Sequence, residues 1–457
     1  MYLADTVAAI ATPLGSGGIG IIRVSGPDAE RIGSLIFTGV KGGGFESHRL
    51  YYGRFVDPVD GSLIDEGMAV LMRAPRSYTR EDVLELHCHG GYLVVYKLLQ
   101  AAVSSGARPA EPGEFTRRAF LNGRIDLCQA ESVLDVINSR TGASLALANR
   151  QREGMLGRQL ADIRMQLIGV LALIEAHIDF PEEDIELASL AVVTEQVESV
   201  RALITRLLAS FNYGKVMREG VSLLLAGKPN TGKSSLLNAL LCEERAIVSS
   251  IPGTTRDLIE ETVSIKGLPV RIIDAAGIRH DHHDEVEKEG IRRTLERLSE
   301  ADMTLFLVDG TCPLDRDDQA IMSAISGRIS LTVITKHDIA SSGEMVCAEG
   351  CIGQVHISSK TGYNLDRLRD LIFDYFTSAV GRDSDDLAVL STVRHNEALC
   401  KALAAINIFS DHAASSFPPE LLAADLRDAL SAIGEITGET TPDAVLDVIF
   451  SSFCIGK

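Results

Sequence analysis

A glycine-rich octapeptide in the middle of the chain has residue types and spacing suited to holding phosphate. Residues 227–234 read GKPNTGKS, which fits G-x-x-x-x-G-K-[ST]. The glycines allow main-chain N–H groups to converge on phosphate oxygens, and Lys233 supplies a positive charge for the β and γ phosphates. The Ser234 hydroxyl is placed to ligate Mg²⁺. Further candidate ligand-binding residues of this loop are Asn230, Thr231, Gly232 and Ser235.

Four further polar segments follow this loop along the chain. Thr254-Thr255-Arg256-Asp257 offers hydroxyls for Mg²⁺ and the γ-phosphate, so Thr255 is a catalytic candidate beside Lys233. Asp274-Ala275-Ala276-Gly277 ends a predicted strand with an acid for the Mg²⁺ shell and a glycine N–H for the γ-phosphate. In Thr335-Lys336-His337-Asp338, the last carboxylate can accept two N–H bonds from guanine, which adenine cannot offer. Ser358-Ser359-Lys360 can contact the base oxygen. Together with the loop, these segments resemble the five motifs of small GTP-binding proteins and predict GTP hydrolysis.

Three positions depart from the usual motifs. Ala275 stands where threonine is usual, and Thr335 stands where asparagine is usual. Many GTPases carry glutamine after the glycine of the acidic motif, to orient the attacking water, whereas this chain has Ile278. An isoleucine side chain has no donor or acceptor for that task. We therefore expect hydrolysis to use another polar group or an ion, unlike a simple Ras-like switch.

The elements that must position these residues follow from the periodicity of the sequence. Apolar strand-like runs are predicted at 221–225, 270–274, 304–309, 331–335 and 355–358. They alternate with helical segments, which is typical of a mostly parallel sheet covered on both faces. Helical periodicity also marks 129–149, 160–177 and 190–211, and it returns after about residue 381. This α/β block is therefore predicted to be inserted into one helical domain, although two separate helical domains would give the same pattern.

Composition and charge limit the remaining possibilities. The chain has 457 residues and a formal net charge of −19, which argues against a general nucleic-acid coat. One possible local basic patch for RNA is Arg117, Arg118 and Arg124, although exposed charges of this kind usually have no such role. We see no leader peptide, and the most apolar stretch, 165–174, is too short to span a bilayer. The expectation is a cytoplasmic protein without stable membrane insertion.

Several motifs outside the nucleotide segments resemble those of the MnmE (TrmE) family of tRNA-modification GTPases. They are ATP at 11–13 with GGIGIIRVSG at 17–26, PRSYT at 75–79, ELHCHGG at 85–91, PGEFTRRAFLNG at 112–123 and FCIGK at 453–457. This resemblance covers essentially the whole chain. It implies a multidomain α/β plus α fold: an N-terminal folate-binding and dimerisation domain at 1–118, a helical domain at 119–215 and 381–457, and an inserted Ras-like P-loop GTPase domain at 216–380.

The resemblance also implies a function. Family members form homodimers and work with an FAD-dependent partner, MnmG (GidA), in a heterotetramer or larger assembly. The complex adds an aminomethyl or carboxymethylaminomethyl group at C5 of a wobble uridine in tRNA. The carbon comes from 5,10-methylene-tetrahydrofolate, for which 5-formyl-tetrahydrofolate is an analogue. The family residues for folate match Arg23, Glu81, Arg124 and Lys457, with arginine at 124 where lysine is also found.

The family further implies a potassium ion beside the phosphates. Its ligands match the Asn230 side chain and the main-chain oxygens of Ser249, Ile251 and Thr254. Such an ion can supply transition-state charge that an arginine finger gives elsewhere, which answers the lack of glutamine at 278. The family glutamate that orients water matches Glu287, although this residue also fits the exposed face of a helix. The competing functions are a ribosome-assembly GTPase and a dynamin-like GTPase, neither of which would need a folate site.

Overall fold

The computed structural model describes residues 5–40, 44–179, 190–243, 261–274, 298–340, 348–377, 388–415 and 417–457. These residues form two compact units. The first unit comprises the described residues up to Leu134 together with Ile433–Lys457, and the second lies between Asp135 and Ala432. Both ends of the chain therefore belong to the first unit.

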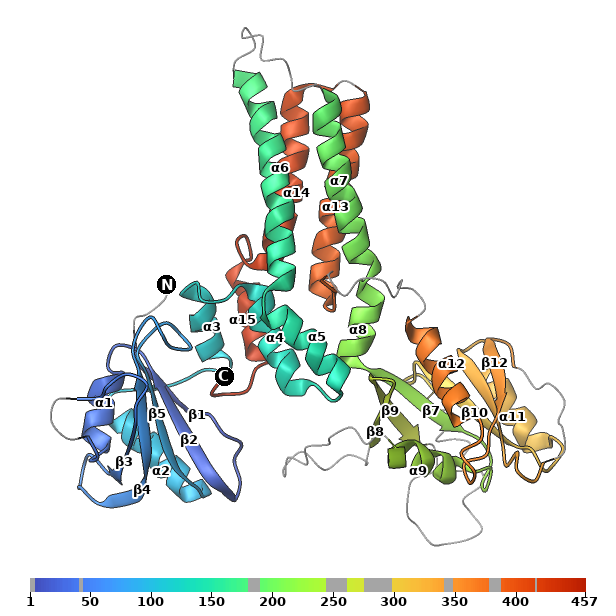
Figure 1. The fold of residues 1–457 in the computed structure, drawn as a ribbon, viewed down its shortest axis with the longest axis horizontal. Coiled ribbons are helices and arrows are strands. Elements are labelled where there is room, and N and C mark those ends of the chain that lie inside the picture. Colours follow the sequence, from blue (N-terminus) through green and yellow to red (C-terminus); the bar gives the residue numbers. More distant parts are fainter. Residues whose placement is uncertain are drawn as a thin grey trace. The chain divides into compact units, whose positions relative to one another are not determined.

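A six-stranded sheet forms the centre of the first unit (Figure 1). The strands are β1 (Val7–Ile10), β2 (Gly17–Ser25), β3 (Leu50–Val56), β4 (Leu63–Met72), β5 (Val83–Gly90) and β6 (Arg108–Pro109), in the order β3-β4-β5-β2-β1-β6. The β1–β6 pair is parallel and the other pairs are antiparallel. Alternate residues such as Ile22 and Leu86 face a core shared with α1 (Ala29–Ile36) and α2 (Tyr92–Ser104).

The chain's last residues return to this unit. Helices α3 (Glu114–Leu121), α4 (Leu127–Asn138) and α15 (Asp443–Ser451) meet in a small apolar cluster that includes Leu127 and Phe450. Beyond α15, Ile455 forms an antiparallel bridge with Pro112. The Phe115 amide donates a hydrogen bond to the Lys457 main-chain oxygen over 3.2 Å. The predicted boundary at residue 118 falls inside α3, and the C-terminal segment packs against the N-terminal part of the chain.

The second unit contains a sheet of mainly parallel strands. It consists of β7 (Val221–Ala226), β8 (Glu261–Ile265), β9 (Leu268–Asp274), β10 (Met303–Asp309), β11 (Ser330–Thr335) and β12 (Cys351–His356), in the order β12-β11-β10-β7-β9-β8. The pair β8–β9 is antiparallel, and the other pairs are parallel. Five strands overlap the predicted runs, but β12 spans Cys351–His356 and shares only two residues with the predicted run 355–358. The edge strand β8 is additional.

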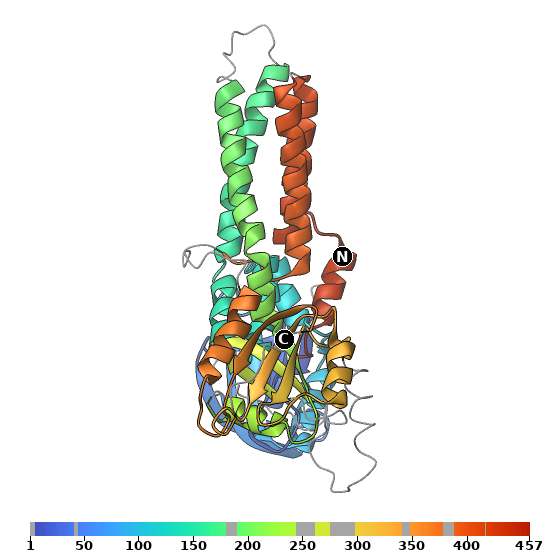
Figure 2. The same ribbon diagram turned by 90° about the vertical axis from the view of Figure 1, so that its right-hand side faces the viewer.

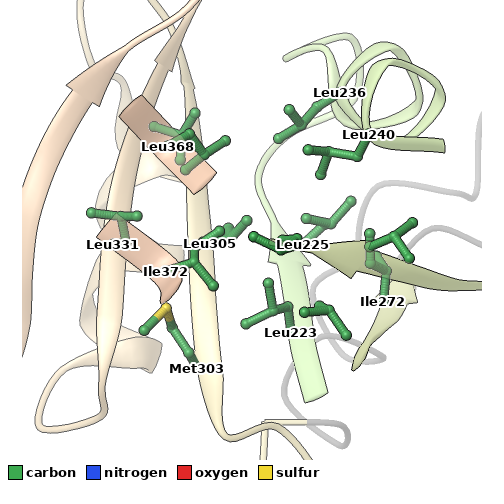
Figure 3. Packing of buried hydrophobic residues seen from close by; sticks show 14 of the residues in the cluster. Leu223, Leu225, Leu236, Leu240, Ile272, Met303, Leu305, Leu331, Leu368 and Ile372 are labelled. Carbon is green, nitrogen blue, oxygen red and sulfur yellow. The ribbon is translucent and has the colours of Figure 1, made fainter. Parts of the chain in front are cut away.

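Both faces of this sheet are covered, because neighbouring residues of its strands point in opposite directions. Leu223 and Leu225 pack on one face with α9 (Lys233–Glu243) and α12 (Leu365–Thr377), while Leu224 and Ala226 pack on the other with α11 (Arg316–Ile325). Figure 3 shows Leu236 of α9 and Leu368 of α12 directed toward the strands. The almost continuous apolar runs of β7 and β10 reflect burial on both faces.

Four long helices form a bundle whose members run alongside one another in both views (Figures 1 and 2). They are α6 (Met155–Asp179), α7 (Leu190–Ala209), α13 (Val393–Ala414) and α14 (Pro419–Thr437). Their buried residues recur at steps of three and four, as in Leu156, Leu160, Ile163, Leu167, Val170 and Ile174 of α6. In the described part of the chain, no helix is long and apolar enough to cross a bilayer.

Two short helices connect the bundle to the sheet, and both divide runs predicted as continuous. The run 129–149 is split between α4 and α5 (Gly142–Arg152), because the Thr141 side chain caps α5 in a capping box with Ser144. The run 190–211 ends at Ala209, and α8 (Phe211–Glu219) then leads directly into β7.

Candidate functional site

The glycine-rich loop connects β7 to α9, at the carboxyl end of the β7 strand. Gly227 passes so close to β10 that a β-carbon there would lie 2.6 Å from the Leu307 main-chain oxygen. Asn230 and Gly232 have φ values of 63° and 94°, in the left-handed region that asparagine and glycine tolerate best. These conformations fold the loop back over the first turn of α9. An anion placed there would meet the unpaired N–H groups that begin the helix.

Lys233 lies curled over this loop rather than extended into solvent. Its ammonium group donates hydrogen bonds to the main-chain oxygens of Gly227 and Lys228 at 2.7 and 2.6 Å. The side chain is largely buried, whereas Ser234 and Ser235 are exposed in the first turn of α9. The positive charge is therefore held above the loop, among carbonyl oxygens that phosphate oxygens could replace.

Thr335 connects the end of β11 to the same loop. Its buried hydroxyl donates a hydrogen bond to the Thr231 main-chain oxygen over 2.7 Å, and the Val308 oxygen lies within 3.1 Å. The Gly232 α-carbon also faces this side chain, because a β-carbon there would lie 3.7 Å from it. The unusual threonine thus links the base-reading segment at 335–338 to the glycine-rich loop.

The predicted base-reading residues lie together beyond β11 and β12. The Ser358 hydroxyl donates to the Asp338 carboxylate over 2.8 Å, and the His337 amide donates to the Ile357 oxygen over 3.0 Å. Ser358 is fully buried, while Asp338 and Lys360 are open to solvent. The hydrogen bond from Ser358 is the main cause that lowers the pKa of Asp338. This carboxylate is therefore kept ionised, as an acceptor of hydrogen bonds must be.

Three ion pairs that the sequence analysis did not identify stabilise this region. Lys228 of the loop reaches Asp315 at 2.6 Å and Asp318 at 2.7 Å, at the start of α11. The hydrogen bond from Lys228 is the main cause that lowers the pKa of Asp315 to about 2. Lys336, with φ of 56°, reaches Asp309 at the end of β10 over 2.5 Å. No local spacing in the sequence signals these contacts, since each joins residues that are far apart along the chain.

Some of the predicted site residues are not among those that the structure describes. They are Ser249, Ile251, Thr254, Thr255, Gly277 and Glu287. Asp274 ends β9, where its main chain pairs with Leu225 of β7 next to the loop. Ser359 is half-buried in the turn after Ser358. Within the described ranges, no group of three histidine, cysteine or acidic residues is arranged to hold a metal ion.

A second group of predicted residues surrounds Tyr78 in the first unit. The guanidinium carbon of Arg124 lies 4.8 Å from the Tyr78 ring centre, and that of Arg23 lies 5.8 Å from it. Arg124 also donates to the Tyr78 main-chain oxygen over 2.7 Å. Arg23 donates to the Gly456 oxygen over 3.2 Å, directly before Lys457. Two of the four predicted folate residues therefore lie beside the Tyr78 ring, and Lys457 follows a residue that one of them contacts. The sequence analysis quoted Tyr78 in a motif but assigned it no role.

Glu81 belongs to a buried ion network instead of standing free. It accepts hydrogen bonds from Ser25 at 2.7 Å and from Arg118 at 3.2 Å. Arg118 is 2% exposed and also binds Asp5 and Glu114. The idea that Arg118 contributes to a surface basic patch is therefore wrong, because its charge is neutralised inside the fold.

Two family models and several relatives together match nearly the whole chain. The family model described as MnmE helical domain matches residues 127–454, and that described as GTP-binding protein TrmE N-terminus matches residues 6–124. A protein of Geobacter sulfurreducens named tRNA modification GTPase MnmE is 53% identical over 457 residues, with 100% of each chain covered. The protein of the same name from Carboxydothermus hydrogenoformans is 44% identical over 99% of each chain. Among solved structures, elongation factor SelB of Methanococcus maripaludis with GppNHp is 18% identical over 36% of each chain, with a TM-score of 0.26.

Proposed function

Because the chain belongs to the MnmE family of tRNA modification GTPases, we propose that it hydrolyses GTP and that this hydrolysis serves the chemical modification of tRNA. The observation that carries the proposal is the similarity to relatives of that name over the full length of the chain. The geometry around the glycine-rich loop supports it, since phosphate-binding and base-reading groups are joined through Thr335.

In this proposal, GTP binds with its phosphates over the loop between β7 and α9. Lys233 exchanges the oxygens of Gly227 and Lys228 for β- and γ-phosphate oxygens, so its charge is already positioned before the nucleotide arrives. Asp338, held as a carboxylate by Ser358, accepts the two N–H groups of the guanine edge. Lys228 holds the loop to α11 through Asp315, which limits the reorganisation needed on binding.

The same loop fits two cations. Ser234 presents an exposed hydroxyl in the first turn of α9, and would hold Mg²⁺ together with Asp274 and Thr255. Asn230 is also exposed, and would give its side-chain oxygen to K⁺ with the main-chain oxygens of Ser249, Ile251 and Thr254. The cations would neutralise charge that develops on the phosphates during hydrolysis. Glu287 would orient the attacking water.

The first unit is the proposed folate site. Arg23, Arg124 and the C-terminal Lys457 would bind the carboxylates of a tetrahydrofolate derivative, and the Tyr78 ring would give its pterin a flat apolar surface. Glu81 would bind the pterin edge from within its ion network. The donor set fits an anionic, aromatic ligand. When bound, the folate would supply the one-carbon unit.

We propose a cytoplasmic homodimer that joins an FAD-dependent, MnmG (GidA)-like partner in a heterotetramer or larger complex. This complex would modify C5 of a wobble uridine with an aminomethyl or carboxymethylaminomethyl group. The domain division proposed is 1–118 for folate, 216–380 for GTP, and the intervening and final segments for the helical domain.

The test is mass spectrometry of tRNA nucleosides from cells that lack the gene. We expect the C5-modified uridines to disappear and to return when the wild-type chain is supplied. An unchanged nucleoside profile in the deletion strain would contradict the proposed function. A ribosome-assembly or dynamin-like GTPase would give that unchanged profile, and it would show no binding of 5-formyl-tetrahydrofolate.

A further inference from the structure

A cavity of about 430 Å³ lies in the second unit, away from the nucleotide loop. Its lining includes the first residues of β7 and the beginning of β9, whereas the glycine-rich loop follows the carboxyl end of β7. The other walls come from the end of α4, the link to α5 and the end of α8. The cavity is therefore placed where the helical segments join the sheet, and its size is in the range of small-ligand sites.

The cavity is lined by three arginines and one glutamate, in a chain whose net charge is −19. The arginines come from different elements: Arg140 from the link between α4 and α5, Arg218 from the last turn of α8, and Arg271 from β9. The one acid, Glu219, is half exposed, and its nearest contact to Arg218 is a weak 4.0 Å. The formal charge of the lining is therefore positive, even though Arg218 forms a salt bridge with Asp135 at 2.7 Å.

Each arginine is oriented by a neighbour. Arg140 donates to the Thr262 hydroxyl over 3.0 Å, which fixes its direction without neutralising its charge. Arg271 donates to the Ser222 hydroxyl over 2.9 Å, and Arg218 donates to Asp135 over 2.7 Å. A guanidinium has five N–H donors and prefers planar, two-point binding of phosphate. Such pre-oriented groups lose less freedom when an anion binds.

We propose that this cavity binds a phosphate-bearing nucleotide unit, with Arg140 and Arg271 on the phosphate. Asn138, which also lines the cavity, offers an amide that can pair with polar edges of a base or sugar. An RNA chain and a free nucleotide share this chemistry. The assignment to RNA rests on the proposed function in tRNA modification, while the assignment to a phosphate does not. Because the cavity walls belong both to the sheet and to helices, the bound ligand would contact both and stabilise their packing.

The first arm of the test measures labelled tRNA binding by fluorescence anisotropy over a range of KCl concentrations. The full-length protein is saturated with GDP, so that the nucleotide loop is occupied. The variant is Arg140→Gln with Arg271→Gln, and the matched control is Arg201→Gln with Arg427→Gln on the bundle surface. We expect the first pair to weaken binding on the order of tenfold or more and to reduce the salt slope by about two. The control should change neither quantity.

The second arm measures heat on titrating adenosine monophosphate or inorganic phosphate into the same GDP-saturated proteins. Heat that disappears in the cavity variant, with unchanged tRNA affinity, would identify a free nucleotide or phosphate as the source. If the cavity variant matches the control in both arms, the proposal is overturned. If the wild-type protein binds no tRNA, that result would contradict the proposed function instead. The second arm would still show whether the cavity binds a phosphate. Should the glutamine variant not fold, Arg140→Lys with Arg271→Lys keeps the charge but removes two-point binding.

Discussion

The hydroxyl of Thr335, at the end of β11, donates a hydrogen bond to the main-chain oxygen of Thr231 in the glycine-rich loop over 2.7 Å. Asparagine is usual at position 335 in GTP-binding proteins, and its amide would be expected to contribute to the base pocket. Here the shorter side chain stays buried and braces the phosphate loop. Threonine at this position therefore joins the base-reading segment to the phosphate-binding loop through a hydrogen bond.

Removing this hydroxyl should weaken nucleotide binding. In Thr335→Val the shape is kept, but the buried Thr231 oxygen loses its donor, which costs about 1–3 kcal/mol. We expect GDP affinity to fall on the order of tenfold and the melting temperature to fall with it. The control is Thr332→Val on the same strand. The Thr332 hydroxyl lies 3.5 Å from the Cys351 sulfur, which is a weak contact. Equal GDP affinity in the two variants would show that Thr335 is not a brace.

Guanine selectivity should depend on Asp338. The Asp338→Asn variant should prefer xanthosine triphosphate over GTP, because an amide can donate to the additional oxygen of xanthine. Competition between the two nucleotides measures the change. The depressed pKa of Asp338 sets the pH dependence: selectivity should hold above the ordinary aspartate range, and should be lost only as the pH falls through the lower folded pKa. Wild-type protein that hydrolyses ATP as fast as GTP would contradict this assignment.

Potassium dependence should reside in the Asn230 side chain. We expect GTP turnover to be much faster in K⁺ than in Na⁺ at equal ionic strength, because Ile278 cannot orient water and an ion is needed. Since Asn230 has φ of 63°, an alanine variant would add backbone strain. Asn230→Gly avoids that strain and removes the side-chain amide with its oxygen, so it should abolish the difference between the salts. A K⁺ advantage that survives in the glycine variant would exclude the Asn230 oxygen as a ligand.

Folate binding should depend on the arginines beside Tyr78. Calorimetry with 5-formyl-tetrahydrofolate should show binding without nucleotide. Arg124→Gln should weaken it on the order of tenfold, since hydrogen bonds to charged groups contribute about 1.5–3 kcal/mol. The matched control is Arg117→Gln, whose charge pairs with Asp447 over 3.0 Å away from the ring. Absence of heat with folded wild-type protein would contradict the proposed folate site.

The sequence predicts well those features that depend on local pattern. The strands β7 and β10 are apolar almost throughout because both faces of their sheet are buried, so their positions can be predicted from the sequence. The edge strand β8 reads ETVSI and lacks that pattern. The helix breaks before α5 and α8 are not evident in the sequence, because apolar residues keep their helical spacing across them. Only the break before α5 has a local signal, which is the capping residue Thr141.

Features that depend on distant contacts are not readable in this way. The spacing of the glycine-rich loop predicts that it lies between a strand and a helix, as β7 and α9 confirm. It does not predict the pairing of Lys228 with Asp315, because 87 residues separate them. Arg118 looks like an exposed charge in sequence, but its partners Asp5 and Glu81 come from other parts of the first unit. The position of Tyr78 between Arg23 and Arg124 is likewise a product of the fold.

We expect tRNA modification to depend on GTP hydrolysis by this chain. To test this, a deletion strain is complemented with the wild-type chain or with Lys233→Ala, and its tRNA nucleosides are analysed by mass spectrometry at equal protein levels. We predict that the wild-type chain restores the C5-modified wobble uridines and that Lys233→Ala does not, because the charge over the phosphates is lost. Full restoration by Lys233→Ala, with GTP hydrolysis abolished in the purified variant, would contradict the claim.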